Sequence, residues 1–137
     1  MDKGMKVVID TNVLVSSLSS HSKYHWLILA LLQEKFTLLL NHEILLEYEE
    51  VLMRKYSFSI AGHFLHALSE LPNVEEVFVY YNWNLLHDAD DNKFVDVYIA
   101  GKANYLITED NDFKLLKQID FPPVNVLGIN DFEKLLS

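Results

Sequence analysis

The stretch Met5-Lys6-Val7-Val8-Ile9-Asp10-Thr11-Asn12 decides the fold class, because a short β-branched run passes directly into polar capping residues. Residues 5–9 are predicted as a buried strand, and a helix is predicted to follow over 11–20. The rest of the chain repeats this alternation. Further helices are predicted at 24–34, 42–56 (with Asn41 as N-cap), 59–71, 91–103, 112–118 and 131–136, and further strands at 36–40, 74–80, 105–107 and 124–127.

Strands separated by helices favour a parallel sheet that is covered on both faces. We therefore predict an α/β fold: a three-layer α/β/α sandwich with a central, mainly parallel sheet, as one domain over residues 1–137. In such folds ligands bind beyond the carboxyl ends of the strands, near the point where the strand order reverses.

The composition excludes several classes of protein. The chain has no cysteine, so disulfide scaffolds, thiolate zinc fingers and cysteine nucleophiles are ruled out. Eleven Lys and Arg residues against twenty Asp and Glu give a net charge of −9, and Arg54 is the single arginine. A nucleic-acid binder normally carries a basic surface that neutralises phosphates. If this chain handles nucleic acid, a divalent cation or a basic partner must supply the positive charge.

No membrane or export segment is expected. The longest apolar run, Trp26 to Leu32, is far shorter than the roughly 20 residues that a spanning helix needs. The N-terminal residues also lack the pattern of a signal peptide. The chain is therefore predicted to be cytoplasmic.

Two acids occupy unusual places in the first half of the chain. Asp10 directly follows a predicted strand, where α/β sheets keep their chemistry, although it could equally cap the next helix. Glu47 borders the apolar stripe of the predicted helix 42–56, and it could simply be a boundary residue whose stem covers apolar surface.

Three acids in the second half are equally unusual. Asp96 lies in an almost wholly apolar helical run, where an unpaired charge would cost several kcal/mol, so we expect a partner for it. That partner is either a metal ion or one of the lysines Lys93 and Lys102, and the metal is preferred. Asp110 and Asp112 follow the predicted strand 105–107, where helix capping is again the alternative.

These acids converge on one region of the predicted sheet. Carboxylates brought so close repel each other and raise one another's pKa, and a divalent cation removes that cost. Carboxylate and water ligands suit Mg²⁺ or Mn²⁺, ions that polarise phosphoryl oxygens and activate water. The pattern therefore predicts metal-dependent hydrolysis of phosphodiester bonds.

Five sequence blocks resemble the PIN domain family, and their order and spacing span nearly the whole chain. The blocks are 8–14 (VIDTNVL), 41–48 (NHEILLEY), 88–94 (DADDNKF), 96–100 (DVYIA) and 106–113 (LITEDNDF). The paired acids before Asn92 are most similar to the bacterial and archaeal branch of putative toxins from toxin–antitoxin pairs.

The resemblance implies an Mg²⁺- or Mn²⁺-dependent endoribonuclease that acts on RNA, with an antitoxin protein as partner and a homodimer as the assembly. Mapped by motif, the catalytic acids fall on Asp10, Glu47, Asp96 and Asp110. Asp91 competes with Asp96 as a metal ligand, and Asp112 lies close to Asp110. Residues that orient the carboxylates or water fall on Thr11, Asn12 and Thr108. The alternative is a catalytically weak module that sequesters RNA or a protein.

Overall fold

A single parallel sheet forms the centre of the protein, which is described here by a computed structural model of residues 4–137. Its five strands have the order β3-β2-β1-β4-β5, and every neighbouring pair is parallel. This confirms the predicted parallel α/β class. The strands are β1 (Lys6–Ile9), β2 (Thr37–Leu40), β3 (Val74–Glu76), β4 (Tyr105–Ile107) and β5 (Val126–Leu127).

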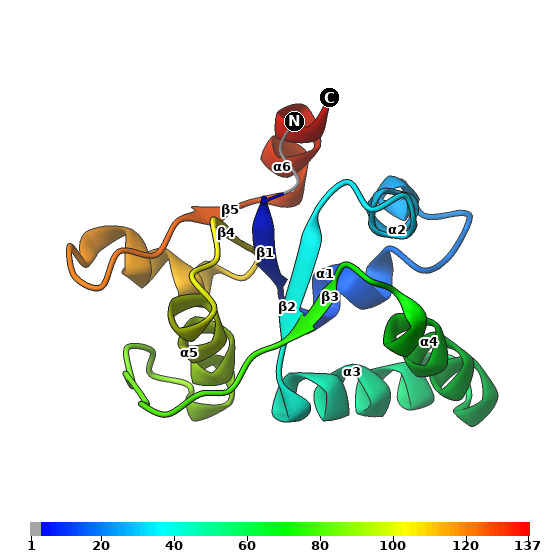
Figure 1. Cartoon of the computed structure of the whole chain (residues 1–137), viewed down its shortest axis with the longest axis horizontal. Helices are drawn as coiled ribbons and strands as arrows, with labels where there is room; N and C mark the ends of the chain where they lie inside the picture. The colour runs from blue at the N-terminus through cyan, green and yellow to red at the C-terminus, as the bar shows by residue number, and fades with distance from the viewer. Residues whose placement is uncertain (1–3) are drawn as a thin grey trace.

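Helices cover both faces of the sheet, so the predicted three-layer sandwich is also confirmed (Figure 1). One face carries α1 (Thr11–Ser16), α2 (His25–Leu32), α3 (His42–Lys55) and α4 (Phe58–Glu70). The other carries α5 (Asn92–Ala100), which contacts β1, β2 and β4. Short 3-10 segments η1 (Ala89–Asp91) and η2 (Asn111–Gln118) and the terminal helix α6 (Ile129–Leu136) complete the described chain.

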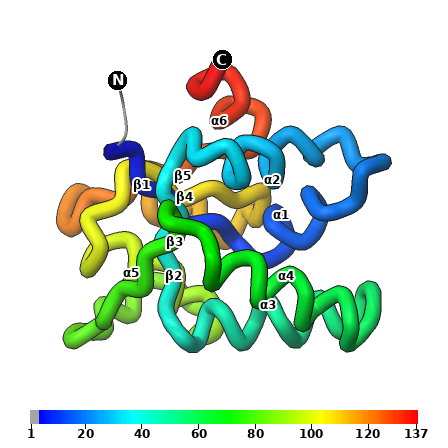
Figure 2. Tube along the Cα trace, turned by 45° about the vertical axis from the view of Figure 1, so that its right-hand side comes forward, coloured from blue at the N-terminus to red at the C-terminus, as the bar shows by residue number. Residues whose placement is uncertain are grey.

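The strand order reverses between the central strand β1 and its neighbour β4. From β1 the chain proceeds to β2 and β3 on one side, and it then returns through α5 to add β4 and β5 on the other side. In Figure 2 the chain leaves β2 at the bottom of the view and enters α3 there. The residues after β1 and β4 therefore flank the crevice where doubly wound sheets bind ligands.

Apolar side chains on the strands and helix faces explain why this arrangement is stable. Val7, Val8 and Ile9 of β1 are fully buried, as the predicted central strand requires. Helix α3 buries the apolar stripe predicted from its sequence, and the Asn41 side chain accepts a hydrogen bond of 2.9 Å from the Ile44 N–H. That contact confirms Asn41 as the N-cap of α3.

Some predicted boundaries were wrong, for local reasons. Helix α1 ends at Ser16 rather than at residue 20. The hydroxyls of Ser16 and Ser17 donate to main-chain carbonyls one turn earlier, and such bonds compete with continuation of the helix. Strand β3 ends at Glu76 rather than at residue 80, because its partner β2 ends at Leu40. The segment 112–118 lies within a 3-10 helix, and the last strand starts at Val126 instead of 124.

The C-terminal helix is attached to the end of β4 by one side chain. The Glu109 carboxylate accepts a hydrogen bond of 2.7 Å from the Ile129 N–H at the start of α6. Gly128 permits this close approach, because a Cβ atom there would lie 2.8 Å from the Glu109 Oε2 atom. Glu109 thus joins the carboxyl end of the sheet to the last helix.

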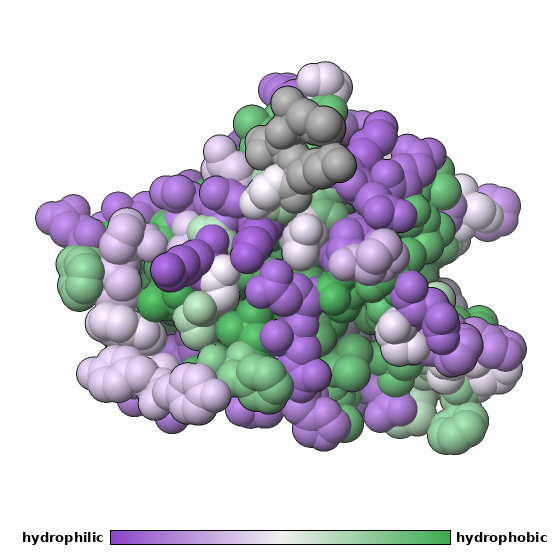
Figure 3. Space-filling view, viewed as in Figure 1, coloured by the Kyte–Doolittle hydropathy of each residue, from purple (hydrophilic) through white to green (hydrophobic). Residues whose placement is uncertain are grey.

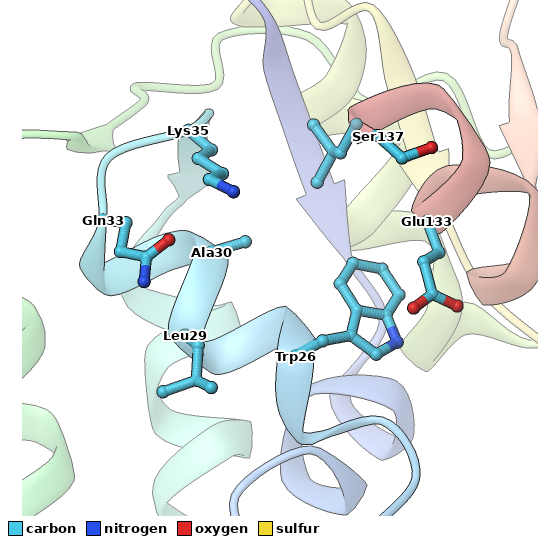
Figure 4. A pocket seen from close by; sticks show the side chains of 8 residues that line it. Trp26, Leu29, Ala30, Gln33, Lys35, Glu133 and Ser137 are labelled. Atoms are coloured by element: carbon cyan, nitrogen blue, oxygen red, sulfur yellow. The ribbon is translucent and has the colours of Figure 1, made fainter.

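A hollow of about 290 Å³ separates α2 from α6 (Figure 4). Its lining includes Trp26, Lys35 and Glu133, and the Trp26 indole N–H, which is buried, has no hydrogen-bond partner among the described residues. The hollow contains none of the acids singled out in the sequence. Within residues 4–137, no helix has the length and apolar character needed to cross a membrane.

Candidate functional site

The ends of β1 and β4 are joined by a pair of hydrogen bonds. The Asp10 N–H donates to the Ile107 carbonyl at 2.9 Å, so the residues that follow β1 and β4 lie side by side. The Thr108 hydroxyl donates to the Asp10 Oδ2 atom at 2.8 Å and fixes the direction of this carboxylate. Asp10 is only 7% exposed, and its burial raises its pKa, with Asp110 and Glu47 adding to the rise.

Helix α3 brings Glu47 to the same place. The Thr11 hydroxyl, at the start of α1, donates to the Glu47 Oε2 atom. The Lys93 ammonium lies 2.5 Å from the Glu47 Oε1 atom and also donates to the Asp90 carbonyl at 2.6 Å. With only 12% of its side chain exposed, Lys93 is a nearly buried cation among acids. Glu47 is therefore held by one hydroxyl and one positive charge.

The tyrosine that follows Glu47 supports the end of β1. The Tyr48 hydroxyl is fully buried and donates to the Ile9 carbonyl at 2.7 Å. Burial, followed by the charges of Asp10 and Glu47, raises the pKa of Tyr48 well above its ordinary value. Tyr48 therefore stays protonated and acts as a structural donor.

Three further carboxylates gather between the start of α5 and the end of β4. Asp91, Asp110 and Asp112 each offer an oxygen atom, and these atoms all lie within 4.8 Å of one another. The Asp110 N–H donates to the Thr108 hydroxyl at 3.0 Å, and the Asp110 Oδ1 atom accepts from the Asp112 N–H at 2.9 Å. Thr108 is therefore bonded to both Asp10 and Asp110, which ties the two acids to one residue.

The electrostatics of Asp91 show how crowded this cluster is. Burial raises the pKa of Asp91 to about 7, and the charges of Asp88, Asp10, Asp110 and Asp112 contribute to the rise. No hydrogen bond is among the causes that act on its carboxylate. A nearby cation would stabilise the anionic form of this carboxylate.

The structure places Asp96 apart from these acids. Its Oδ1 atom accepts the Trp83 N–H at 2.9 Å, and the one neighbouring carboxylate that raises its pKa, after the effect of burial, is Glu43. Asp91 lies in η1 and Asp96 lies one turn into α5, so the two carboxylates point in different directions. The geometry thus groups Asp91, rather than Asp96, with Asp110 and Asp112.

Of the residues predicted to orient the site, two contact acids directly. Thr11 donates to Glu47 and Thr108 donates to Asp10, whereas the exposed Asn12 makes no hydrogen bond to these acids within residues 4–137. The sequence reasoning considered Lys93 only as a partner for Asp96, and it missed its pairing with Glu47. No local signal indicates this pairing, because Lys93 and Glu47 lie on different helices that are far apart in the sequence.

The cluster has the chemistry of a site for a hard divalent cation. Its ligand atoms are carboxylate oxygens from η1, from the N-cap of η2 after β4 and from the first turn of η2, and Mg²⁺ and Mn²⁺ prefer this ligand type. Asp91, Asp110 and Asp112 could hold such an ion, with Asp10 beside them. A bound cation would offset the mutual repulsion that raises the pKa of Asp91.

Comparisons with known proteins agree with this architecture. A chain of VapBC2 from Rickettsia felis, crystallised bound to a DNA fragment from the promoter, matches with a TM-score of 0.64 at 18% identity, over 90% of this chain and 98% of that one. A chain of VapBC-1 from nontypeable Haemophilus influenzae matches with a TM-score of 0.58 at 13% identity, over 92% of this chain and 99% of that one.

The family itself is shown by sequence. No curated protein matches the chain. The model of the PIN domain family, however, matches residues 6–112, which include β1, β4, α3, α5 and every acid of the cluster. The chain therefore belongs to the PIN domain family.

Proposed function

We propose that the protein is a divalent-metal-dependent endoribonuclease that hydrolyses RNA phosphodiester bonds, as the toxin of a toxin–antitoxin pair. The observation that carries this proposal is the cluster of Asp91, Asp110 and Asp112 oxygens within 4.8 Å, beside the buried Asp10 at the strand-order reversal. Family membership and the VapBC neighbours support it.

Four of the acids share one proposed role. Asp10, Asp91, Asp110 and Asp112 hold Mg²⁺ or Mn²⁺, and the ion supplies Lewis-acid activation of a phosphoryl oxygen and of water. Thr108 keeps the carboxylate of Asp10 aimed into the site.

Lys93 is the cation of this site that can meet an RNA phosphate. Its ammonium lies against Glu47, and its move toward a phosphate would release that carboxylate to the ion. Positive charge from Lys93 and the ion offsets the unfavourable net charge of −9.

A protein partner is part of the proposal. Large apolar side chains are exposed on α3 and α4, and Phe58 at the start of α4 is 80% exposed. Figure 3 shows green hydrophobic residues among purple hydrophilic ones at the lower right of the view, where α3 and α4 lie in Figure 1. Exposed apolar surface of this kind is typical of interaction sites. We propose an antitoxin as the partner and a homodimer as the assembly.

The test is cleavage of RNA by the purified protein with Mg²⁺, with Mn²⁺ and with a chelator. We expect cleavage that depends on the ion and is lost in Asp110→Asn, because the amide retains the hydrogen bond to the Asp112 N–H but not the charge. Glu50→Gln, an exposed change on α3 with the same loss of charge, is the matched control. Ion-independent cleavage, or unchanged cleavage by Asp110→Asn, would contradict the proposal.

One observation favours a second function. Glu47 is already neutralised by Lys93 and bonded to Thr11, so the site can exist without an ion at this carboxylate. A catalytically weak module that sequesters RNA or a protein would show binding by the parent protein and no cleavage with either ion.

A further inference from the structure

A polar hollow of about 210 Å³ lies beside the acid cluster and plays no part in holding the proposed ion. Three segments form it: α3, the segment 77–88 and the start of α5. Its volume is below the roughly 300–1,000 Å³ of pockets that hold drug-sized ligands, so it suits a smaller group. The polar lining side chains are Glu43, Asn82, Asn84, Asp90, Asn92, Lys93 and Asp96.

Asp96 is the unexplained group in this hollow. It is 5% exposed, and its Oδ1 atom accepts the Trp83 N–H at 2.9 Å. Its Oδ2 atom receives no hydrogen bond from the described residues but is not fully buried, so it faces solvent in the hollow, and the lysine of the hollow is paired with Glu47. A ligand that donates hydrogen bonds could take the place of water at this oxygen.

The other lining groups narrow the chemistry of that ligand. Glu43 and Asp90 add two more carboxylate acceptors, while the amide groups of Asn82 and Asn84 can donate as well as accept. Guanine fits this combination: its N1–H and N2–H₂ groups are adjacent donors, and its O6 atom is an acceptor. Adenine, cytosine and uracil lack two adjacent donor groups on the edge that forms base pairs.

We propose that this hollow binds a guanine base of single-stranded RNA, with Asp96 and Glu43 accepting from the N1–H and N2–H₂ groups. This inference rests on the proposed ribonuclease function, and it adds the specificity of the same site. Proteins that read RNA sequence commonly bond to the pairing edges of unstacked bases in this way.

The hollow lies within reach of the acid cluster. Glu43 and Glu47 are four residues apart on α3, so one helical turn of about 6 Å separates their positions. Lys93 belongs to both places, because its ammonium contacts Glu47 while its side chain lines the hollow. A base in the hollow and the phosphate of an adjoining nucleotide can therefore be bound together.

The segment 77–88 also offers surfaces for neighbouring bases. Tyr81 and Trp83 contact each other edge to face with ring centroids 4.9 Å apart, and Trp83 packs against Phe121 at 6.0 Å. Tyr80 and Tyr81 are exposed. Aromatic side chains stack on bases of single strands with little preference for sequence. The same segment thus supplies stacking rings beside the hollow and amides inside it.

The test measures RNA binding with Asp110→Asn, which we expect not to cleave, in Mg²⁺. Fluorescently labelled pentanucleotides UUGUU, UUAUU and UUIUU, where I is inosine, are compared by anisotropy. We expect roughly tenfold tighter binding of UUGUU than of UUAUU, and an intermediate affinity for inosine because it lacks the N2 amino group. Adding Asp96→Asn replaces an acceptor with a donor while an oxygen remains for the Trp83 N–H, and it should remove the preference.

Controls and outcomes separate this inference from the proposed function. Adding Glu50→Gln instead of Asp96→Asn should leave the preference for guanine intact, and melting temperatures establish that each variant is folded. Equal binding of the three RNAs, or a guanine preference that survives Asp96→Asn, overturns the inference.

If Asp96→Asn weakens binding of all three RNAs equally and only when Mg²⁺ is present, the hollow holds a cation and the inference is again wrong. If the parent protein cleaves RNA but shows no base preference, only this inference fails; if the parent neither cleaves nor binds RNA, the proposed function fails with it.

Discussion

Asp10 and Asp96 are both nearly buried aspartates, yet their surroundings differ in kind. Asp10 ends the central strand β1 and lies near other carboxylates, with a threonine hydroxyl as its side-chain donor. Asp96 lies inside α5, takes a main-chain N–H, and has Glu43 as its acidic neighbour. Burial raises the pKa of both. The comparison teaches that burial alone does not place a carboxylate in the acidic cluster; its position at the end of a central strand does.

The largest expected effect is on the rate of RNA cleavage, which should distinguish the acidic cluster from the surroundings of Asp96. Asp91→Asn should lower the rate of RNA cleavage by about 100-fold or more, because it removes charge that stabilises the proposed ion and transition state. Asp96→Asn should lower cleavage of a guanine-containing RNA by roughly tenfold, the loss expected for one base contact. Initial rates on the same labelled RNA measure both, and equal losses would erase the distinction.

Metal binding should sharpen the same contrast. With Mn²⁺ at about 100 times its Kd, the folded protein gains about 2.7 kcal/mol and its melting temperature rises. Asp91→Asn and Asp110→Asn should lose most of this gain, because each removes a carboxylate of the cluster. Asp96→Asn should retain it. Thermal melts with and without a chelator measure the gain. A loss confined to Asp96→Asn would show that the ion binds at Asp96 and not at the acidic cluster.

Thr108→Val tests whether the donor to Asp10 matters. Loss of the hydroxyl frees the Asp10 carboxylate to turn and removes the bond from the Asp110 N–H. We expect Mn²⁺ affinity to fall about 10- to 100-fold and stability to fall by about 1 kcal/mol. Titration calorimetry and denaturant unfolding measure the two effects. Thr37→Val on β2 is the control, and an unchanged affinity in Thr108→Val would show that Asp10 needs no such support.

The smallest effect is the pH dependence of stability without metal. The pKa of Asp91 is raised from 3.8 to about 7 in the folded protein, so proton binding there stabilises the fold at low pH. That contribution is lost as the pH rises through about 7. Asp91→Asn should therefore gain stability relative to the parent between pH 5 and pH 8, by no more than about 1 kcal/mol because solvent screens this partly exposed group. A stability difference that does not change with pH would contradict the coupling.

Much of the fold was predictable because its signals are local. The run 5–9, the capping residue Asn41 and the apolar stripe of α3 each follow from neighbouring residues, and each has the predicted structure. Element ends were less predictable. Strand β3 stops where its partner β2 stops, and that limit lies more than thirty residues away in the sequence.

The site shows the same division. Asp10 and Asp110 stand at strand ends, so their proximity followed from the parallel sheet. The choice between Asp91 and Asp96 could not be made, because it depends on where η1 gives way to α5 and on the donor from Trp83. The pairing of Lys93 with Glu47 joins two helices, and no local pattern encodes it.

The bond from Ile129 to Glu109 makes the end of the chain part of the site's support. Alternation along residues 108–110 sends Thr108 and Asp110 toward the acids while Glu109 anchors α6. Truncation before Ile129, or a bulky side chain in place of Gly128, would detach that carboxylate and add another mobile negative charge next to Asp110. Engineering of this protein, including the choice of terminus for an affinity tag, should therefore treat the last nine residues as coupled to ion binding.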